Sequence, residues 1–83
     1  MKEIIFDYSK LRGRIKERYE NEANFSKVLD ASPSSLSAKL NNKAYFNPGD
    51  ILKILEVLEI PDEEVKVYFF NRKVRKTEQE YAS

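Results

Sequence analysis

Apolar residues recur at helical spacing in four stretches of the chain, separated by short polar segments. Leu11, Ile15 and Tyr19 lie one turn apart and predict a first helix over about residues 8–19. The same spacing predicts a second helix over about 22–29 and a third over about 33–41. The fourth is the clearest, because its apolar residues follow the i, i+3, i+4, i+7 pattern of an amphipathic helix: Ile51, Ile54, Leu55 and Leu58.

Helix start signals precede these four stretches. The residues placed to cap the helix N-termini are Asp7, Asn21, Ser32 and Asn47. Pro33 suits the first position of the third helix, where its missing N–H costs nothing, and Asp50 completes a capping box with Asn47. Gly13 lies inside the first helix at a cost of about 1 kcal/mol relative to Ala. We therefore expect Gly13 to pack closely against a neighbouring backbone.

A fifth, shorter helical segment follows the break at Ile60-Pro61-Asp62 and runs to about Phe69. Its start is either Pro61 or Asp62. Residues 71–83 are polar and predict a tail that is helical at most in part, and only Glu3–Phe6 suggests a strand. The expected organisation is one domain over residues 1–70, followed by a polar, partly ordered tail over residues 71–83.

Composition narrows the classes of function. The chain has 83 residues, 41% apolar and 35% charged, which favours a small helical domain with a highly charged surface. It has no Cys and no His, so it lacks the thiol nucleophile, the commonest general base and the commonest metal ligands. We expect no enzyme, no cofactor, no metal and no small-molecule substrate. The apolar runs are too short for a membrane span or signal peptide, which predicts a cytoplasmic protein.

Charge is separated along the chain, although the formal net charge is only +1. Lys10–Arg18 carries five cations, Glu56–Glu64 carries five acids, and Arg72–Lys76 is basic again. Because local potential governs attraction within about 8–10 Å, a near-neutral total does not exclude an anionic partner. The alternative is that these charges only solvate helix faces.

The second and third predicted helices are joined by only three residues, Asp30-Ala31-Ser32, which is the spacing of a helix-turn-helix. The sequence from Asn21 through Leu36, the following Leu40-Asn41-Asn42-Lys43 and the Ile51–Leu58 helix resemble the Cro/phage-repressor helix-turn-helix family, especially small phage-encoded Cro-like regulators. The resemblance covers residues 7–70. The chain departs from the family at Ser26 and Asp30, where Ala and Gly are usual.

The resemblance implies an all-α, lambda-repressor-like DNA-binding domain of five short helices, with its helix-turn-helix at about residues 22–41. It also implies binding to double-stranded DNA without a cofactor, as a homodimer on a partly palindromic operator. The family usually has an ion pair between its first and third helices. The matching positions here are Ile15 and Leu40, so we expect a hydrophobic contact instead.

The third predicted helix has a free face that suits DNA. Leu36 and Leu40 mark its inner side, and no carboxylate occurs across residues 31–49. By the resemblance, the base-reading positions are Pro33, Ser34, Ser37 and Ala38. Ser bonds several base edges without strong preference and Ala contacts a thymine methyl, but neither makes the bidentate contacts of Arg or Gln.

Contacts to the DNA backbone are expected around that helix. The candidates are Asn21, Ser35, Asn41, Asn42, Lys43 and Tyr45. Glu22 would repel phosphate unless an Arg of the first helix pairs with it. The acidic cluster at 56–64 should face away from the duplex. Tyr68-Phe69-Phe70 holds more aromatic surface than one short helix buries, so Tyr68 and Phe70 are candidate dimer contacts.

The sequence therefore predicts a sequence-specific transcriptional regulator of phage or prophage origin that inserts helix 33–41 into the major groove. The alternative is a protein–protein interaction module, such as an antirepressor or adaptor, on the same scaffold with weak or no DNA binding. The absence of Arg, Gln and His from the third helix favours this alternative. A salt titration separates the two, because binding through phosphates weakens steeply as salt rises.

Overall fold

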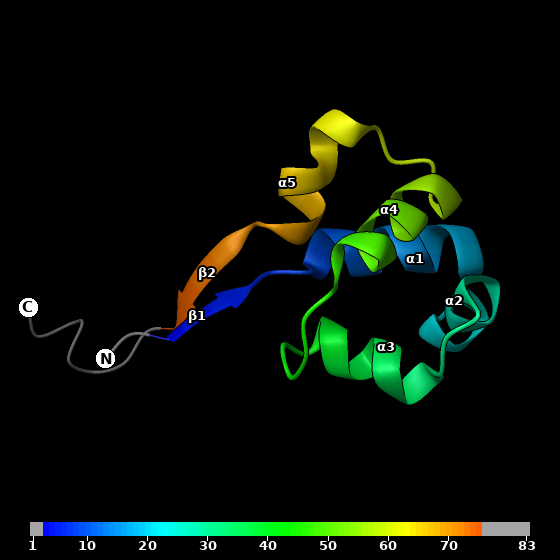
Figure 1. Ribbon diagram of the computed structural model, residues 1–83, viewed down its shortest axis with the longest axis horizontal. Helices are drawn as coiled ribbons and strands as arrows, with labels where there is room; N and C mark the ends of the chain where they lie inside the picture. Colours follow the sequence, from blue (N-terminus) through cyan, green and yellow to red (C-terminus); the bar gives the residue numbers. More distant parts are fainter. Residues whose placement is uncertain (1–2, 76–83) are drawn as a thin grey trace, which may run out of the picture.

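The computed structural model describes residues 3–75 and shows five short α-helices with a two-stranded antiparallel sheet (Figure 1). The prediction of a small helical domain is confirmed. In chain order the elements are β1 (Glu3–Phe6), α1 (Ser9–Tyr19), α2 (Glu22–Leu29), α3 (Pro33–Leu40), α4 (Pro48–Val57), the 3-10 turn η1 (Asp62–Glu64), α5 (Val65–Phe69) and β2 (Arg72–Arg75). No helix within residues 3–75 has the length and apolar character needed to cross a membrane.

The helices enclose one hydrophobic core. In Figure 1, α2 and α3 lie on one side of α1 and α4, while η1 and α5 lie on the other. Most residues of the predicted apolar stripes are buried, while Tyr19 and Ile51 are half-buried against the core. Leu11, Phe25 and Leu58 have no exposed surface. The remaining buried apolar residues are Tyr8, Ile15, Leu29, Leu36, Leu40, Ile54, Leu55, Ile60, Tyr68 and Phe69. Ile15 and Leu40 are both in this core, as expected for an apolar replacement of an ion pair.

The helix starts follow the capping residues, with one shift. The side chains of Asn21, Ser32 and Asn47 each accept a hydrogen bond from the backbone N–H three residues later, and Asn47 with Asp50 forms the predicted capping box. Asp7 lies one residue further from its helix than predicted. Tyr8 occupies the N-cap position, and Asp7 Oδ1 accepts a hydrogen bond from the Ser9 N–H at 2.9 Å. This bond is the main reason that the pKa of Asp7 is lowered.

Residues in the left-handed conformation end the helices before and after the tight turn. Asp30 has φ 58° and Asn42 has φ 63°. An Asp and an Asn thus adopt the left-handed conformation that Gly usually adopts at the end of a helix. Ser26, the other departure from the family pattern, is fully buried, and its hydroxyl donates to the Ala23 carbonyl at 2.7 Å. Both substitutions therefore fit the helix-turn-helix without an unpaired buried group.

The predicted polar tail begins with a strand rather than a helix. Arg72–Arg75 pairs antiparallel with Glu3–Phe6, with Phe6 opposite Arg72, and the two strands project from the helices as an arm (Figure 1). The start left open between Pro61 and Asp62 lies at Asp62, where η1 begins, with Pro61 in the N-cap position. The helix α5 begins only at Val65. The last residues of the predicted tail, 76–83, lie outside the described residues.

Side chains and backbone tie this arm to the helical body. The Asn42 carboxamide bonds both backbone groups of Phe6, accepting from its N–H and donating to its carbonyl, each at 2.9 Å. The Asp7 N–H donates to the Asn71 carbonyl at 2.8 Å. The Phe6 ring contacts the Phe70 ring edge-on, with centroids 6.0 Å apart. The base of the arm is thus fixed to the end of α3 and to the end of α5.

The prediction that Gly13 packs closely against a neighbouring backbone is wrong. Gly13 is exposed, and a Cβ built there meets no atom within 4 Å outside the helix's own backbone and chain neighbours. No close backbone approach requires a glycine at this position. Its φ is not positive, so the backbone conformation does not require one either.

We predict that Gly13→Ala stabilises the protein by about 0.5–1 kcal/mol, because Ala loses less backbone entropy than Gly in a helix interior. Urea denaturation followed by far-ultraviolet circular dichroism measures this difference. Gly49→Ala is the control, because its Cβ would lie 3.3 Å from the Asn47 side chain that caps α4. Equal or lower stability of the Gly13 variant would contradict the prediction.

Candidate functional site

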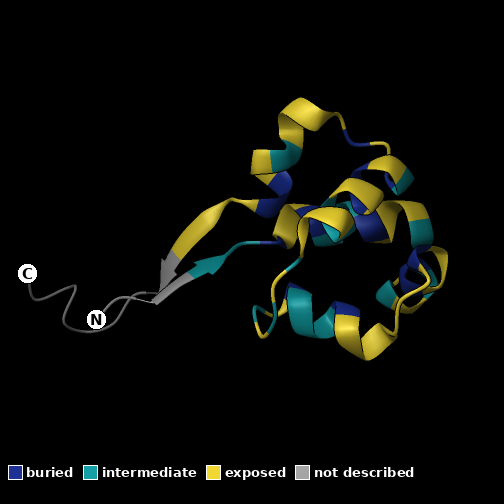
Figure 2. Cartoon of the chain, viewed as in Figure 1, coloured by how far each residue is buried: buried dark blue, intermediate teal, exposed yellow. Residues whose placement is uncertain are grey.

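The outer surface of α3 begins exposed and becomes half-buried towards its end (Figure 2). Of the predicted base-reading residues, Pro33 and Ser34 are exposed, whereas Ser37 and Ala38 are half-buried. Leu36 and Leu40 point inward, each 3% exposed. No other element within residues 3–75 covers the first turn of α3, so this surface is available to a partner.

The polar groups on this surface are short and partly engaged. The Ser34 hydroxyl lies 3.4 Å from the hydroxyl of Ser32, whose side chain also caps α3. The Asn41 amide donates to the Ser37 carbonyl at 2.9 Å and to the Ser37 hydroxyl at 3.2 Å. Ser35 is exposed, and its backbone N–H donates to the cap. The outer surface of α3 therefore offers a partner short hydroxyl side chains, which bond only to groups that come close to the helix. It offers no long side chain as a hydrogen-bond donor.

Arg12 connects the start of α2 with the end of α3. One guanidinium nitrogen, Nη1, contacts Glu22 Oε2 at 2.6 Å. The other, Nη2, donates to the Leu40 carbonyl at 3.2 Å and to Asn41 Oδ1 at 2.9 Å. This is the predicted pairing of Glu22 with an Arg of the first helix. It brings the predicted contact residues Asn21 and Asn41 to the same side of the molecule.

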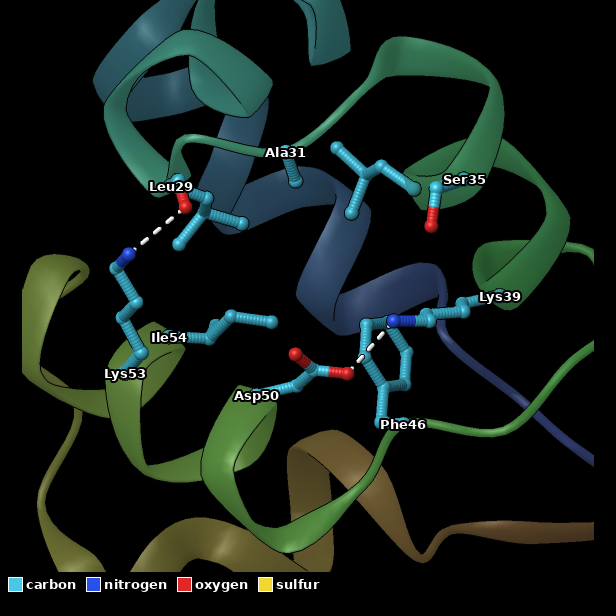
Figure 3. Close-up of a pocket in the computed structure, with 9 residues that line it drawn as sticks. Leu29, Ala31, Ser35, Lys39, Phe46, Asp50, Lys53 and Ile54 are labelled. Carbon is cyan, nitrogen blue, oxygen red and sulfur yellow. Dashed lines mark hydrogen bonds and ion pairs between the residues drawn. The ribbon is translucent and has the colours of Figure 1, made fainter.

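A second polar contact joins α3 to α4 (Figure 3). Lys39 Nζ lies 2.6 Å from Asp50 Oδ2, beside a small cavity of about 40 Å³. The same Asp50 oxygen accepts the Asn47 N–H of the capping box at 3.2 Å. Lys53 extends from α4 to the end of α2 and donates to the Leu29 carbonyl at 2.8 Å. Both lysines are thus used to hold the helix-turn-helix against α4.

The predicted backbone-contact residues are in different situations. Asn42 binds Phe6 through both atoms of its amide, so it anchors the arm instead of standing free. Asn21 is exposed, and its side-chain oxygen caps α2. Lys43 is exposed, and no ion pair within residues 3–75 involves it. Tyr45 is 82% exposed. Lys43 and Tyr45 are the freest of the group.

The acidic cluster at residues 56–64 lies away from α3, as expected. The segment from Glu56 to Glu64 ends α4 and forms η1, on the opposite side of the molecule from α3 in Figure 1. Within it, Glu59 pairs with Arg18 at 2.9 Å. Of the two dimer-contact candidates, Tyr68 is buried at 7% exposure and Phe70 is 45% exposed. Only the Phe70 ring therefore presents a substantial free surface.

Three contacts were not predicted from the sequence: Lys39 with Asp50, Lys53 with Leu29, and Asn42 with Phe6. Each joins residues at least eleven positions apart and depends on how the helices pack. Asp50 carried a visible signal, its capping-box position, but nothing local indicated its second partner. In the part of the chain that the structure describes, no three Asp or Glu residues gather as they would around a metal ion.

The Lys39 ammonium lowers the pKa of the Asp50 carboxyl, mainly through their hydrogen bond, with the Asn47 N–H adding to the effect. A carboxyl whose pKa is depressed on folding stabilises the native state above its ordinary value of 3.8. That stabilisation is lost as the pH falls through the folded value. Asp50 therefore makes the junction between α3 and α4 sensitive to acid.

We predict that Lys39→Met has a smaller loss of stability between about pH 7 and about pH 3 than the wild type, because Asp50 then titrates closer to its ordinary pKa. Urea denaturation at both pH values measures this. Lys43→Met is the matched control, because it removes a nearby exposed charge that has no carboxylate partner within residues 3–75. The same acid dependence in the Lys39 variant and the wild type would show that the pair does not titrate with folding.

Comparisons with known proteins place the chain in a family. Residues 4–72 match the family described as a protein of unknown function, DUF739. No curated protein sequence matches. The solution structure of the modulator of repression (MOR) of the temperate bacteriophage TP901-1 from Lactococcus lactis is similar, with a TM-score of 0.72 and 38% sequence identity over 80% of this chain and 89% of that one. This chain is therefore related to a phage regulatory protein and belongs to the DUF739 family.

Proposed function

We propose that this chain is a phage-type regulator that modulates a repressor by protein–protein contact, using the outer surface of α3 and the loop that follows it. The observation that carries the proposal is the chemistry of α3. Its exposed side chains are short and neutral, and none can make a bidentate contact with a base. The similarity to a phage modulator of repression supports the same role.

The cations around α3 support protein contact over phosphate contact. Arg12 is paired with Glu22, Lys39 is paired with Asp50, and Lys53 donates to the Leu29 carbonyl. Binding to DNA through phosphates gains its free energy from cations that replace condensed counterions. Cations already engaged within the fold contribute less to such binding. Of the two cations in α3 and the loop after it, Lys39 is paired and only Lys43 has no ion pair within residues 3–75, which is little of the charge that a DNA-binding surface normally supplies.

The same surface has features that suit a protein partner. Small side chains at Ser34 and Ala38 allow a close approach of another backbone, and Pro33 adds rigid apolar surface. Tyr45, 82% exposed in the loop after α3, is the kind of aromatic side chain that anchors protein interfaces. A helix-turn-helix of the Cro/phage-repressor type would then present its third helix to a repressor instead of to a base sequence.

The second candidate is sequence-specific DNA binding by the chain itself. One observation favours it: residues 31–49 contain no carboxylate, and Lys43 and Tyr45 are exposed beside α3. Such a surface does not repel a duplex. Under this candidate, Ser34 and Ala38 read bases at close range, Lys43 contacts phosphate, and two copies bind a partly palindromic operator.

We predict that the chain forms a complex with the repressor encoded in the same phage or prophage genome, measurable by size-exclusion chromatography with light scattering. Ser34→Glu should weaken this complex at least about tenfold, because it places a charge at the centre of the contact surface. Its thermal stability should be unchanged or slightly higher, since a carboxylate near a helix N-terminus is favourable. Lys66→Glu, an exposed change on α5, is the matched control and should bind as the wild type does.

The competing candidate is tested on the chain alone, by selecting bound sequences from a random duplex pool and titrating salt. Protein-only contact predicts no enriched motif. An enriched motif whose affinity falls with a log–log slope of about −0.9 per phosphate, and which Ser34→Glu abolishes, would establish DNA binding and displace the proposal.

A further inference from the structure

An apolar groove lies between α4 and the η1–α5 segment. In Figure 1, the η1–α5 segment lies on the other side of α1 and α4 from α3. Its volume is about 360 Å³. Six of the seven residues that line it are apolar, and the seventh is an acid: Pro48, Ile51, Leu52, Leu55, Val65, Phe70 and Asp62. The lining of this groove contains no residue of α3 or of the loop that follows α3. Leu55 belongs to the core, Ile51 and Val65 pack against it, and Phe70 contacts Phe6, whereas Leu52 is outside the core cluster.

Large apolar side chains are exposed along the groove. Leu52 is 65% exposed and Phe70 is 45% exposed, although both lie beside a well-formed core. Ile51 and Phe70 also line an adjoining cavity of about 210 Å³, whose other lining residues are all aromatic and include Tyr45 of the loop after α3. The apolar surface is therefore continuous from one hollow to the next. Contiguous apolar surface of this kind marks interaction sites in small proteins.

Acidic residues border the groove. Asp62 lines it, Glu63 and Glu64 precede its wall residue Val65, and Glu56 lies one helical turn after Leu52. Within residues 3–75, no ion pair neutralises these four carboxylates. Lys66 is the one cation of the described η1–α5 segment. The groove thus combines an apolar floor with an acidic edge at η1, where Asp62, Glu63 and Glu64 are exposed. The cations nearest its walls along the chain are Lys53, Lys66 and Arg72.

We propose that this groove binds a basic amphipathic helix of a partner protein. The apolar stripe of such a helix would cover Leu52 and Phe70, and its Lys or Arg side chains would meet the acidic border. We choose this occupant because its positive charges complement the acidic residues beside the groove. A second copy of the chain is the poorer fit, because a two-fold interface brings the same residues of both copies together and would set the two acidic borders against each other.

The test uses the full chain, labelled with nitrogen-15, and two synthetic peptides of about 18 residues, long enough for five helical turns. Both carry the same Leu stripe at helical spacing. One has Lys and the other Glu on its polar face. The basic peptide should bind and shift the amide signals of residues 48–55 and 62–70, with an affinity at least about tenfold higher than that of the acidic peptide.

Variants of the chain separate this site from non-specific adhesion. Leu52→Ser and Phe70→Ser should each weaken the basic peptide at least about fivefold, and Glu63→Lys with Glu64→Lys should remove most of the preference for it. Val28→Ser is the matched control, because Val28 is also 45% exposed but lies on α2. If Leu52→Ser or Phe70→Ser fails to fold, its spectrum will show the amide signals of unfolded protein. The variant with Glu63→Lys and Glu64→Lys then decides the result, because both positions are exposed.

Three outcomes would overturn the proposal: shifts outside the groove, equal binding of both peptides, or no binding. A dimer of the free chain that Phe70→Ser dissociates would also overturn it, because the groove would then be a contact between copies. These results are independent of the repressor complex. Ser34→Glu should leave peptide binding unchanged, so the α3 surface and the groove can fail separately.

Discussion

The position of α3 depends on the guanidinium of Arg12. The core holds α3 through Leu36 and Leu40, but apolar contacts are non-directional and fix its orientation only loosely. Arg12 adds direction, because its planar donor fork binds Glu22 at the start of α2 and both Leu40 and Asn41 at the end of α3. The Cro/phage-repressor family, which this sequence resembles, usually has an ion pair between the first and third helices. In this chain a surface-level Arg provides the link instead, and the core positions Ile15 and Leu40 stay apolar.

Much of the fold could be predicted because its signals are local. Capping residues such as Asn47 act on N–H groups three residues away, and the apolar stripe around Ile54 repeats within one helix, so a short window of sequence contains the whole cause. The strand β2 could not be found this way. Arg72–Arg75 is polar and forms a strand only because Glu3–Phe6 lies beside it, about seventy residues away in the chain.

The candidate site was predictable in outline and not in detail. The exposed face of α3 follows from the period of Leu36 and Leu40. Whether the side chains around α3 are free to bind a partner cannot be predicted in this way, because it depends on contacts made on folding. Asn42 was a candidate contact to the DNA backbone and is bound to Phe6, and Lys39 is bound to Asp50. For a surface of this kind, counting cations in the sequence overstates the positive charge that a partner meets. That difference is one of the grounds on which we propose contact with a protein.

The amide bridge between Asn42 and Phe6 has a mechanical consequence. Asn42 lies in the left-handed conformation directly after the C-cap residue of α3 and also binds the first strand, so the arm and the end of the helix cannot be displaced independently without breaking two hydrogen bonds. The two-stranded sheet and the end of the helix-turn-helix are therefore joined into one unit by a single side chain.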